Sequence, residues 1–309
     1  MSSKWTAAEI PDQNGRIAIV TGANSGLGLM TARELARAGA RVVMACRNEE
    51  RGREAVRAVE ARAPGAAVEL EALDLASLSS VRSFAERVRE RHPALDLLIN
   101  NAGVMAPPRR ETADGFELQF GTNHLGHFAL TGLLLDTLEG RDDARVVTLS
   151  SGAHRSGRIA FDNLGGERHY FRWRAYGQSK LANLMFALEL DRRLRAAGSS
   201  IKSLAAHPGW AATNLQTSGP PKLDALLMAL PNRFYAQSDE MGALPTLYAA
   251  TEPGLEGGAY IGPDGFAEGR GHPIRVSPSR AARDESVARM LWEVSEEMTG
   301  VRIAPAVPA

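Results

Sequence analysis

Short apolar runs alternate with longer amphipathic segments through the first two thirds of the chain. The apolar runs are RIAIVT (16–21), RVVMAC (41–46), AVELEALD (67–74), LDLLIN (95–100), RVVTLSS (145–151) and IKSLAAH (201–207). Between and after them the apolar residues recur at helical spacing, which predicts helices over residues 26–38, 49–62, 77–91, 112–138, 174–197 and 237–250. Strands that are apolar throughout and alternate with helices are typical of a parallel sheet covered on both faces. The pattern therefore predicts an α/β fold with a doubly wound parallel sheet.

The chain contains no internal repeat and no low-complexity linker, which favours one continuous domain over residues 1–309. Two stretches rich in glycine, proline or aromatic residues, 152–174 and 214–240, interrupt the alternation after a strand. We expect both at the carboxyl edge of the sheet, where such folds bind ligands, with the second acting as a substrate lid. Residues 278–299 are predicted to form an amphipathic C-terminal helix whose apolar stripe is Val287, Met290, Leu291, Val294 and Met298.

Composition narrows the class of partner. Lysine plus arginine number 36 and aspartate plus glutamate number 36, so nothing calls for nucleic acid, and a small molecule is the expected partner. A single cysteine, Cys46, suits a reducing compartment. Without a signal-peptide pattern or an unbroken apolar span, the chain is expected to be soluble and cytoplasmic with no stable membrane anchor. The apolar stretch Leu223–Pro231 is interpreted as a lid helix, with contact with a membrane surface as the alternative, and monomer and homo-oligomer are both compatible with the sequence.

A glycine-rich turn, TGANSGLG, joins the first strand to the first helix. Gly22, Gly26 and Gly28 would let the backbone turn tightly and approach a pyrophosphate at the helix N-terminus. The second strand ends in Arg47, with no acidic residue until Glu49. An arginine here accommodates the 2′-phosphate of NADP, whereas NAD sites carry an acid, so NADP(H) is preferred and NAD(H) is the alternative. A solvated arginine before a helix is the other interpretation of Arg47.

Tyr176 and Lys180 lie four residues apart in YGQSKLANLMFALEL, on the same face of a predicted helix. A nearby ammonium favours the phenolate, so we expect Lys180 to lower the pKa of Tyr176 toward a useful acid/base range. The pair predicts acid/base chemistry in a cleft.

The glycine spacing G-x-x-x-G-x-G and the pair Y-x-x-x-K resemble the short-chain dehydrogenase/reductase family. This resemblance implies a single-domain Rossmann fold of about seven strands, with the cofactor-binding and catalytic core over residues 16–213. It assigns catalytic roles to Asn123, Ser151, Tyr176 and Lys180, with Asn123 holding a water next to the lysine. It assigns cofactor contacts to Gly22, Asn24, Ser25, Gly26, Leu27, Gly28, Arg47, Asp74, Leu75, Asn101, Ala102, Gly103, Tyr176, Lys180, Pro208, Gly209 and Thr213.

Two of these assignments, Ser151 and Asn123, have alternatives from the sequence, since Ser150 is also a hydroxyl at the end of the same strand. Ser150 is expected to face away from the site because neighbouring strand residues alternate faces. Asn123 could instead be a buried amide that caps or kinks its helix. His124 and His127 lie nearby without carboxylate or cysteine ligands in a recognisable spacing, so no catalytic metal is expected.

The gap of 25 residues between Ser151 and Tyr176, with TNHLGHF, AYGQSKLAN, GGAYIGPDG and LWEVSEEMTG, resembles the retinol-dehydrogenase-like branch. This branch includes WW-domain oxidoreductases and protochlorophyllide reductases. The resemblance implies an NADP(H)-dependent oxidoreductase acting on a lipophilic aldehyde, ketone or alcohol. Retinoid activity does not carry over directly, since the membrane-anchored retinoid enzymes have an N-terminal apolar segment, and one cysteine argues against the chlorophyll enzymes.

The apolar side chains of the two inserts would either line a substrate site or pack the inserts onto the body. They are Phe161, Tyr170, Phe171, Trp173, Trp210, Leu226, Leu227 and Met228. The alternative function is a non-catalytic NADP(H)-binding sensor or scaffold on the same fold. A sugar epimerase or dehydratase is disfavoured by the glycine spacing and by the lack of a longer substrate domain.

Overall fold

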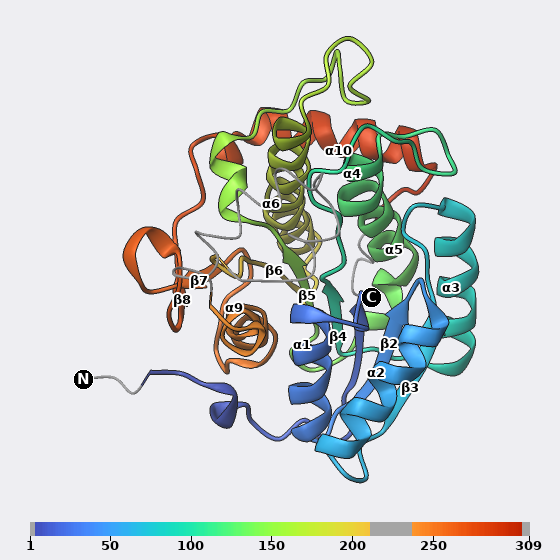
Figure 1. Ribbon diagram of the computed structural model, residues 1–309, viewed down its shortest axis with the longest axis vertical. Helices are drawn as coiled ribbons and strands as arrows, with labels where there is room; N and C mark the ends of the chain where they lie inside the picture. Colours follow the sequence, from blue (N-terminus) through green and yellow to red (C-terminus); the bar gives the residue numbers. More distant parts are fainter. Residues whose placement is uncertain (1–3, 211–236, 305–309) are drawn as a thin grey trace.

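One eight-stranded sheet forms the centre of the protein (Figure 1). The computed structural model describes residues 4–210 and 237–304. The strands are β1 (Ile17–Thr21), β2 (Arg41–Cys46), β3 (Val68–Ala72), β4 (Leu97–Asn100), β5 (Arg145–Leu149), β6 (Lys202–Ala206), β7 (Tyr260–Pro263) and β8 (Pro273–Arg275). Their order is β3-β2-β1-β4-β5-β6-β7-β8, and every pair is parallel except β7 with β8. The predicted doubly wound parallel sheet is confirmed, with one antiparallel strand added at its edge.

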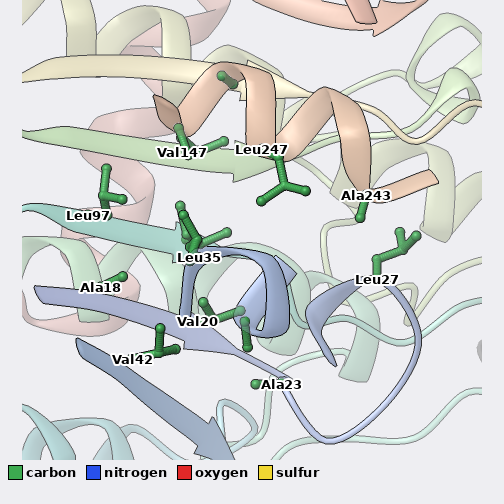
Figure 2. Close-up of a cluster of buried hydrophobic side chains, with 14 of the residues drawn as sticks. Ala18, Val20, Ala23, Leu27, Leu35, Val42, Leu97, Val147, Ala243 and Leu247 are labelled. Carbon is green, nitrogen blue, oxygen red and sulfur yellow. The ribbon is translucent and has the colours of Figure 1, made fainter. Parts of the chain in front are cut away.

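Helices cover both faces of the sheet. The main ones are α1 (Gly26–Arg37), α2 (Glu49–Arg62), α3 (Leu78–Arg91), α5 (Gly126–Leu134), α6 (Arg172–Ala196), α9 (Asp239–Thr251) and α10 (Glu285–Thr299). Neighbouring strand residues alternate between two cores: Val20 packs with α1, α2 and α9, and Ile19 with α3, α5 and α10. Figure 2 shows the first core, in which Leu35 of α1 and Leu247 of α9 approach the strand residues Val20 and Val147.

The helix expected over residues 112–138 begins only at Leu118, and the prediction was wrong before that point. It runs as α4 (Leu118–Phe120), a π-helical turn η2 (Gly121–Leu125), α5 and a 3-10 turn η3 (Leu135–Leu138). The Thr112 hydroxyl accepts hydrogen bonds from the backbone N–H groups of Asp114 and Phe116, and Gly115 has a φ of 84°. This turn competes with helix formation, and the Glu117 carboxylate then caps α4.

The C-terminal helix exists as α10 and starts at Glu285, where the carboxylate of Asp284 caps it. Its buried face is rotated from the predicted stripe, since Met290 is 50% exposed and Trp292 is buried. The Trp292 ring packs against Phe128 and Phe186, with centroid distances of 5.2 and 5.8 Å. An indole in this aromatic cluster buries more apolar surface than the methionine would, so it decides how the helix is rotated.

The edge of the sheet was not predicted as strands. β7 and β8 are short and interrupted by glycines and prolines, so the alternation of apolar runs does not reveal them. The 3-10 turn η5 (Phe266–Glu268) joins them, and the turns η1 (Ala7–Glu9), η4 (Gly152–Ser156) and η6 (Ala281–Arg283) complete the described elements.

Most of the expected lid lies outside the described residues. Residues 211–236 include Thr213, Leu226, Leu227 and Met228, and the last residues assigned to the lid belong to the start of α9. Among residues 4–210 and 237–304, no helix combines the length and apolar character that crossing a membrane requires.

Candidate active site

Ser151, Tyr176 and Lys180 meet at the carboxyl end of β5. Tyr176 and Lys180 project from the first half of α6 and are 9% and 5% exposed. The Ser151 hydroxyl lies beside the phenol of Tyr176, near enough to act on its pKa. Lys180 Nζ donates to the carbonyl oxygen of Leu149 at 3.2 Å and lies 5.9 Å from the centroid of the Tyr176 ring. The sequence spacing thus brings a hydroxyl pair and an amine to one place.

Burial sets the protonation of this cluster. It raises the pKa of Tyr176, and the neighbouring Ser151 hydroxyl opposes that rise only in part. It also lowers the pKa of Lys180 to about 8. The expectation that Lys180 lowers the pKa of Tyr176 was wrong for the protein groups alone, because desolvation outweighs an amine held 5.9 Å from the ring. At neutral pH the phenol keeps its proton.

Ser150, the neighbour of Ser151, points into the interior, as strand alternation predicted. It is 3% exposed, and its hydroxyl donates to the carbonyl oxygen of Lys180 at 2.8 Å. The bond fixes α6 against the end of β5, so Ser150 supports the helix and Ser151 is the hydroxyl at the site.

Asn123 lies in the π-helical turn and is fully buried. Its Oδ1 accepts the backbone N–H of Val104 at 2.7 Å, and its Nδ2 donates to the carbonyl oxygen of Val104 and to Ser179 Oγ. A Cβ added to Gly103 would lie 3.1 Å from Asn123 Oδ1 and 3.5 Å from Lys180 Nζ. Asn123 therefore ties the loop after β4 to α6 beside the lysine.

A second set of contacts behind Asn123 was not predicted. His127 Nδ1 is 2.9 Å from the carbonyl oxygen of Asn123, which can only accept, so Nδ1 carries the proton. Burial lowers the pKa of His127 to about 4, so its Nε2 is unprotonated and accepts a hydrogen bond from the Thr21 hydroxyl at 2.9 Å. Thr21 Oγ1 also accepts the backbone N–H groups of Asn101 and Ala102. The only sequence signal was a histidine at helical spacing from Asn123.

Twelve of the predicted cofactor residues line one cleft of about 910 Å³ at the carboxyl ends of β1, β2, β3 and β4. They are Gly22, Asn24, Ser25, Gly26, Leu27, Gly28, Arg47, Asp74, Leu75, Asn101, Ala102 and Gly103. Four separate loops thus converge, as the carboxyl edge of a doubly wound sheet requires.

The glycine turn is packed as a phosphate cradle needs to be. Gly22 has a φ of 65°, in the left-handed region. A Cβ added to Gly28 would overlap the carbonyl oxygen of Gly22 and lie 2.5 Å from Asn101 Nδ2. The Asn101 amide in turn donates to the carbonyl oxygen of Thr21 at 2.7 Å. The turn, the start of α1 and the loop after β4 therefore leave room only for glycine at position 28, as a turn that approaches a pyrophosphate requires.

The cleft also contains a basic end. Arg47 is exposed after β2, and Arg51, which the sequence analysis did not single out, lines the cleft one helical turn further on. Glu49 pairs with Arg53 at 2.7 Å, whereas neither Arg47 nor Arg51 has an ion pair within the described residues. Two available guanidinium groups suit an anionic ligand.

The remaining predicted residues are more scattered. Pro208 and Gly209 follow β6, and Thr213 lies outside the described residues. Among the insert aromatics, Trp173 packs edge-on against Tyr176, with ring centroids 6.5 Å apart, and Phe171 is 56% exposed. The hydroxyl of Tyr170 is hydrogen-bonded to Gln119 and Glu117, so this side chain anchors the first insert. Phe161 packs away from Tyr176 in a separate apolar cluster.

No group of three or more potential metal ligands occurs within the part of the chain that the structure describes. His124 Nε2 lies 2.9 Å from Ser295 Oγ in an aromatic cluster, apart from the contacts of His127. Cys46 is buried at the end of β2, and burial raises the pKa of its thiol to about 11.

Comparison with known proteins agrees with this geometry. The family model described as short chain dehydrogenase matches residues 16–223. Retinol dehydrogenase 14 of Mus musculus is 42% identical over 93% of this chain and 87% of its own length. Retinol dehydrogenase 12 of Mus musculus is also 42% identical, over 96% of this chain and 89% of its own.

Solved structures are similar over the same region. An uncharacterized protein from Mycobacterium Paratuberculosis has 46% sequence identity and a TM-score of 0.81, covering 99% of this chain and 100% of its own. A short chain dehydrogenase from Shigella flexneri 2A complexed with NADP has 24% identity and a TM-score of 0.63, covering 80% and 96%. The second similarity concerns the fold alone.

Proposed function

Because the chain belongs to the short-chain dehydrogenase family, we propose that this oxidoreductase transfers a hydride between NADP(H) and a lipophilic carbonyl compound or alcohol. The observation that carries the proposal is the Ser151, Tyr176 and Lys180 cluster beside a cleft lined by residues of the glycine turn. Bound NADP(H) supplies the hydride chemistry, and the protein supplies position and electrostatics.

In the reducing direction, the Ser151 hydroxyl hydrogen-bonds the substrate carbonyl oxygen and Tyr176 gives its phenolic proton to that oxygen. The raised pKa of Tyr176 supports this role, since a proton donor must be protonated at neutral pH. Lys180, protonated below about pH 8, offsets the negative charge left on the phenol. Asn123 holds the loop after β4 against α6 beside the lysine. Its backbone carbonyl oxygen accepts from His127 Nδ1 and has a second lone pair that can accept from a water.

The preference for NADP(H) over NAD(H) rests on Arg47 and Arg51. A 2′-phosphate placed between them would receive two charge-assisted interactions, and the nearest acid in sequence, Glu49, is held by Arg53. The Arg47→Ala variant should bind NADPH about 10- to 100-fold more weakly, which corresponds to the about 1.5–3 kcal/mol of a charged hydrogen bond. Its affinity for NADH should change less than threefold, and equal losses for both cofactors in fluorescence titrations would contradict the assignment.

The lipophilic substrate rests on the apolar surroundings of the catalytic tyrosine. Met105, Ala106 and Tyr176 form a buried cluster against which Trp173 packs. The relatives named retinol dehydrogenases support a lipophilic alcohol or aldehyde as the substrate class.

The test is the oxidation of NADPH, and separately of NADH, over a panel of aliphatic, aromatic, steroid and retinoid carbonyl compounds. The Tyr176→Phe variant should lose about 10²- to 10⁴-fold in turnover, because the proton donor is gone, and bind NADPH as the wild type does. A variant that kept most of its activity would refute the role of Tyr176. Tight NADPH binding without turnover on any compound would favour a sensor instead.

A further inference from the structure

The β7–β8 hairpin contains two consecutive non-glycine residues in the left-handed region, Ala267 with a φ of 50° and Glu268 with a φ of 56°. Non-glycine residues rarely adopt this backbone conformation without compensating contacts, and residues that do are frequent at functional sites. The hairpin, orange at the left of Figure 1, was not part of the predicted site. Its contacts therefore need an explanation.

The Glu268 carboxylate bridges two loops. Its Oε1 accepts from Arg155 at 2.7 Å, and its Oε2 lies 3.0 Å from His207 Nε2. His207 Nδ1 accepts the backbone N–H of Gly209 at 3.3 Å, so Nε2 carries the proton and donates to Glu268. The hydrogen bond from His207 and the guanidinium of Arg155 lower the pKa of Glu268 to about 2, so the bridge is ionised at neutral pH.

One of these loops follows β6 and contains Pro208 and Gly209. The hairpin holds it at further points: Trp210 N–H donates to the carbonyl oxygen of Gly269 at 2.6 Å. Gly271 N–H donates to the side chain of Gln237, which donates to the carbonyl oxygen of Pro208 at 2.6 Å. This loop is thus shaped by the hairpin.

The other loop is the turn that carries Ser151. Arg155 belongs to η4, directly after Ser151, and His154 Nδ1 donates to the carbonyl oxygen of Ser151 at 2.7 Å. Tyr260 of β7 packs between this turn and the other loop, with ring centroids 5.5 Å from His154 and 5.2 Å from His207. The hairpin therefore contacts both loops through one aromatic ring and one carboxylate.

We propose that Glu268 is a positioning residue that fixes the Ser151 turn relative to the 207–210 loop. The inference rests on the proposed function, in which Ser151 binds the carbonyl oxygen, and on the family resemblance, which assigns cofactor contacts to Pro208 and Gly209 of the 207–210 loop. A shift between the two loops would misplace the substrate relative to the cofactor, and a displacement of about 1 Å can cost about 10²-fold in rate. Glu268 acts through Arg155 and His207 and touches no reacting group.

The test compares Glu268→Ala and Glu268→Gln with Glu285→Ala, which removes another glutamate–arginine pair, that with Arg289 on α10. For Glu268→Ala we expect kcat, measured well below the melting temperature, to fall about 10- to 100-fold, with the Kd for NADPH close to that of the wild type. The melting temperature should fall as well, because the variant loses two charge-assisted contacts. The kcat of Glu268→Gln, which keeps one acceptor oxygen, should lie between those of the wild type and Glu268→Ala. The kcat of Glu285→Ala should match that of the wild type. The kinetic isotope effect with NADPH deuterated at C4 should rise in Glu268→Ala because hydride transfer becomes slower.

A second measurement does not depend on turnover. Amide hydrogen exchange should increase together in residues 150–157 and 205–210 of Glu268→Ala, and combining Glu268→Ala with Arg155→Ala should add little. If exchange rises only within the hairpin, or if kcat and the isotope effect stay at wild-type values, the positioning role is wrong. A wild type that reduces no carbonyl compound would refute the proposed function, and the exchange result would still decide whether Glu268 couples the two loops.

Discussion

At the residue scale, the site depends on two ionisable side chains that burial pushes toward their neutral forms. Tyr176 has a raised pKa and Lys180 a pKa of about 8. A phenol that holds its proton is a ready donor to a carbonyl oxygen, and an ammonium with a lowered pKa loses its charge just above neutrality. Under the proposed function, these protonation states suit Tyr176 as the proton donor in the reducing direction at neutral pH.

The pH dependence of carbonyl reduction follows from these directions. Below about pH 8 Lys180 is protonated, and as pH rises through that value its charge is lost, so kcat should decline. Deprotonation of Tyr176 should lower kcat only above the usual tyrosine pKa near 10. In Lys180→Arg the cation persists to higher pH, so the residual activity should lose the decline near pH 8. A wild-type kcat that stayed flat to pH 10 would contradict the account.

Motif residues could be predicted from the sequence because their chemistry is carried by residue type and spacing. Tyr176 and Lys180 are recognised by their four-residue interval, and the glycines by their place between a strand and a helix. Thr21, His127 and Glu268 could not, since each acts through contacts with residues far away in the chain. Such contacts leave no periodic pattern.

At the element scale, the most demanding contact is that between the glycine turn, the start of α1 and the loop after β4. The helix approaches so closely that the backbone of Gly22 and the amide of Asn101 fill the space beside Gly28. The sequence predicted this turn correctly, but the helix before Asn123 was predicted too long. The cause is local: the hydrogen bonds of Thr112 stabilise a turn that apolar spacing alone does not register.

A single methyl group at position 28 tests this contact. Gly28→Ala should weaken NADPH binding about tenfold or more. The added methyl group would displace the backbone of Gly22 and the amide of Asn101, and such overpacking costs about 1–3 kcal/mol. Gly65→Ala is the control, since Gly65 has a φ of 84° and open space around it, so it should lower stability and leave cofactor affinity unchanged. Calorimetric titration measures the NADPH affinity of each variant. Equal affinities of Gly28→Ala and Gly65→Ala would show that the contact at Gly28 does not shape the cofactor site.

At the scale of the whole molecule, buried polar contacts join the sheet to the helices that cover it. Arg145 at the start of β5 is fully buried and donates to the carbonyl oxygens of Ala249 and Glu252 at 3.0 and 2.8 Å, which end α9. Its guanidinium also pairs with Asp143. The doubly wound arrangement was predictable from apolar runs. The contacts of Arg145 were not, because an arginine at the start of a strand is usually exposed to solvent.

Unfolding experiments would measure that clamp. Arg145→Met should lower the free energy of unfolding by about 3 kcal/mol or more, since the helix carbonyls lose a buried partner. Arg41→Met breaks an exposed pair with Glu69 and should cost less than about 1 kcal/mol. Urea denaturation of both variants gives the comparison, and similar losses would show that Arg145 contributes no more than a surface arginine.

The central claim is that this protein moves a hydride between nicotinamide and a carbonyl carbon, with Tyr176 as the proton donor. The most direct measurement supplies NADPH deuterated at C4 with a lipophilic aldehyde and determines the mass of the alcohol formed. We predict one deuterium on the former carbonyl carbon with the wild type, and almost no alcohol with Tyr176→Phe. Alcohol without deuterium, or labelled alcohol formed equally well by the variant, would contradict the account.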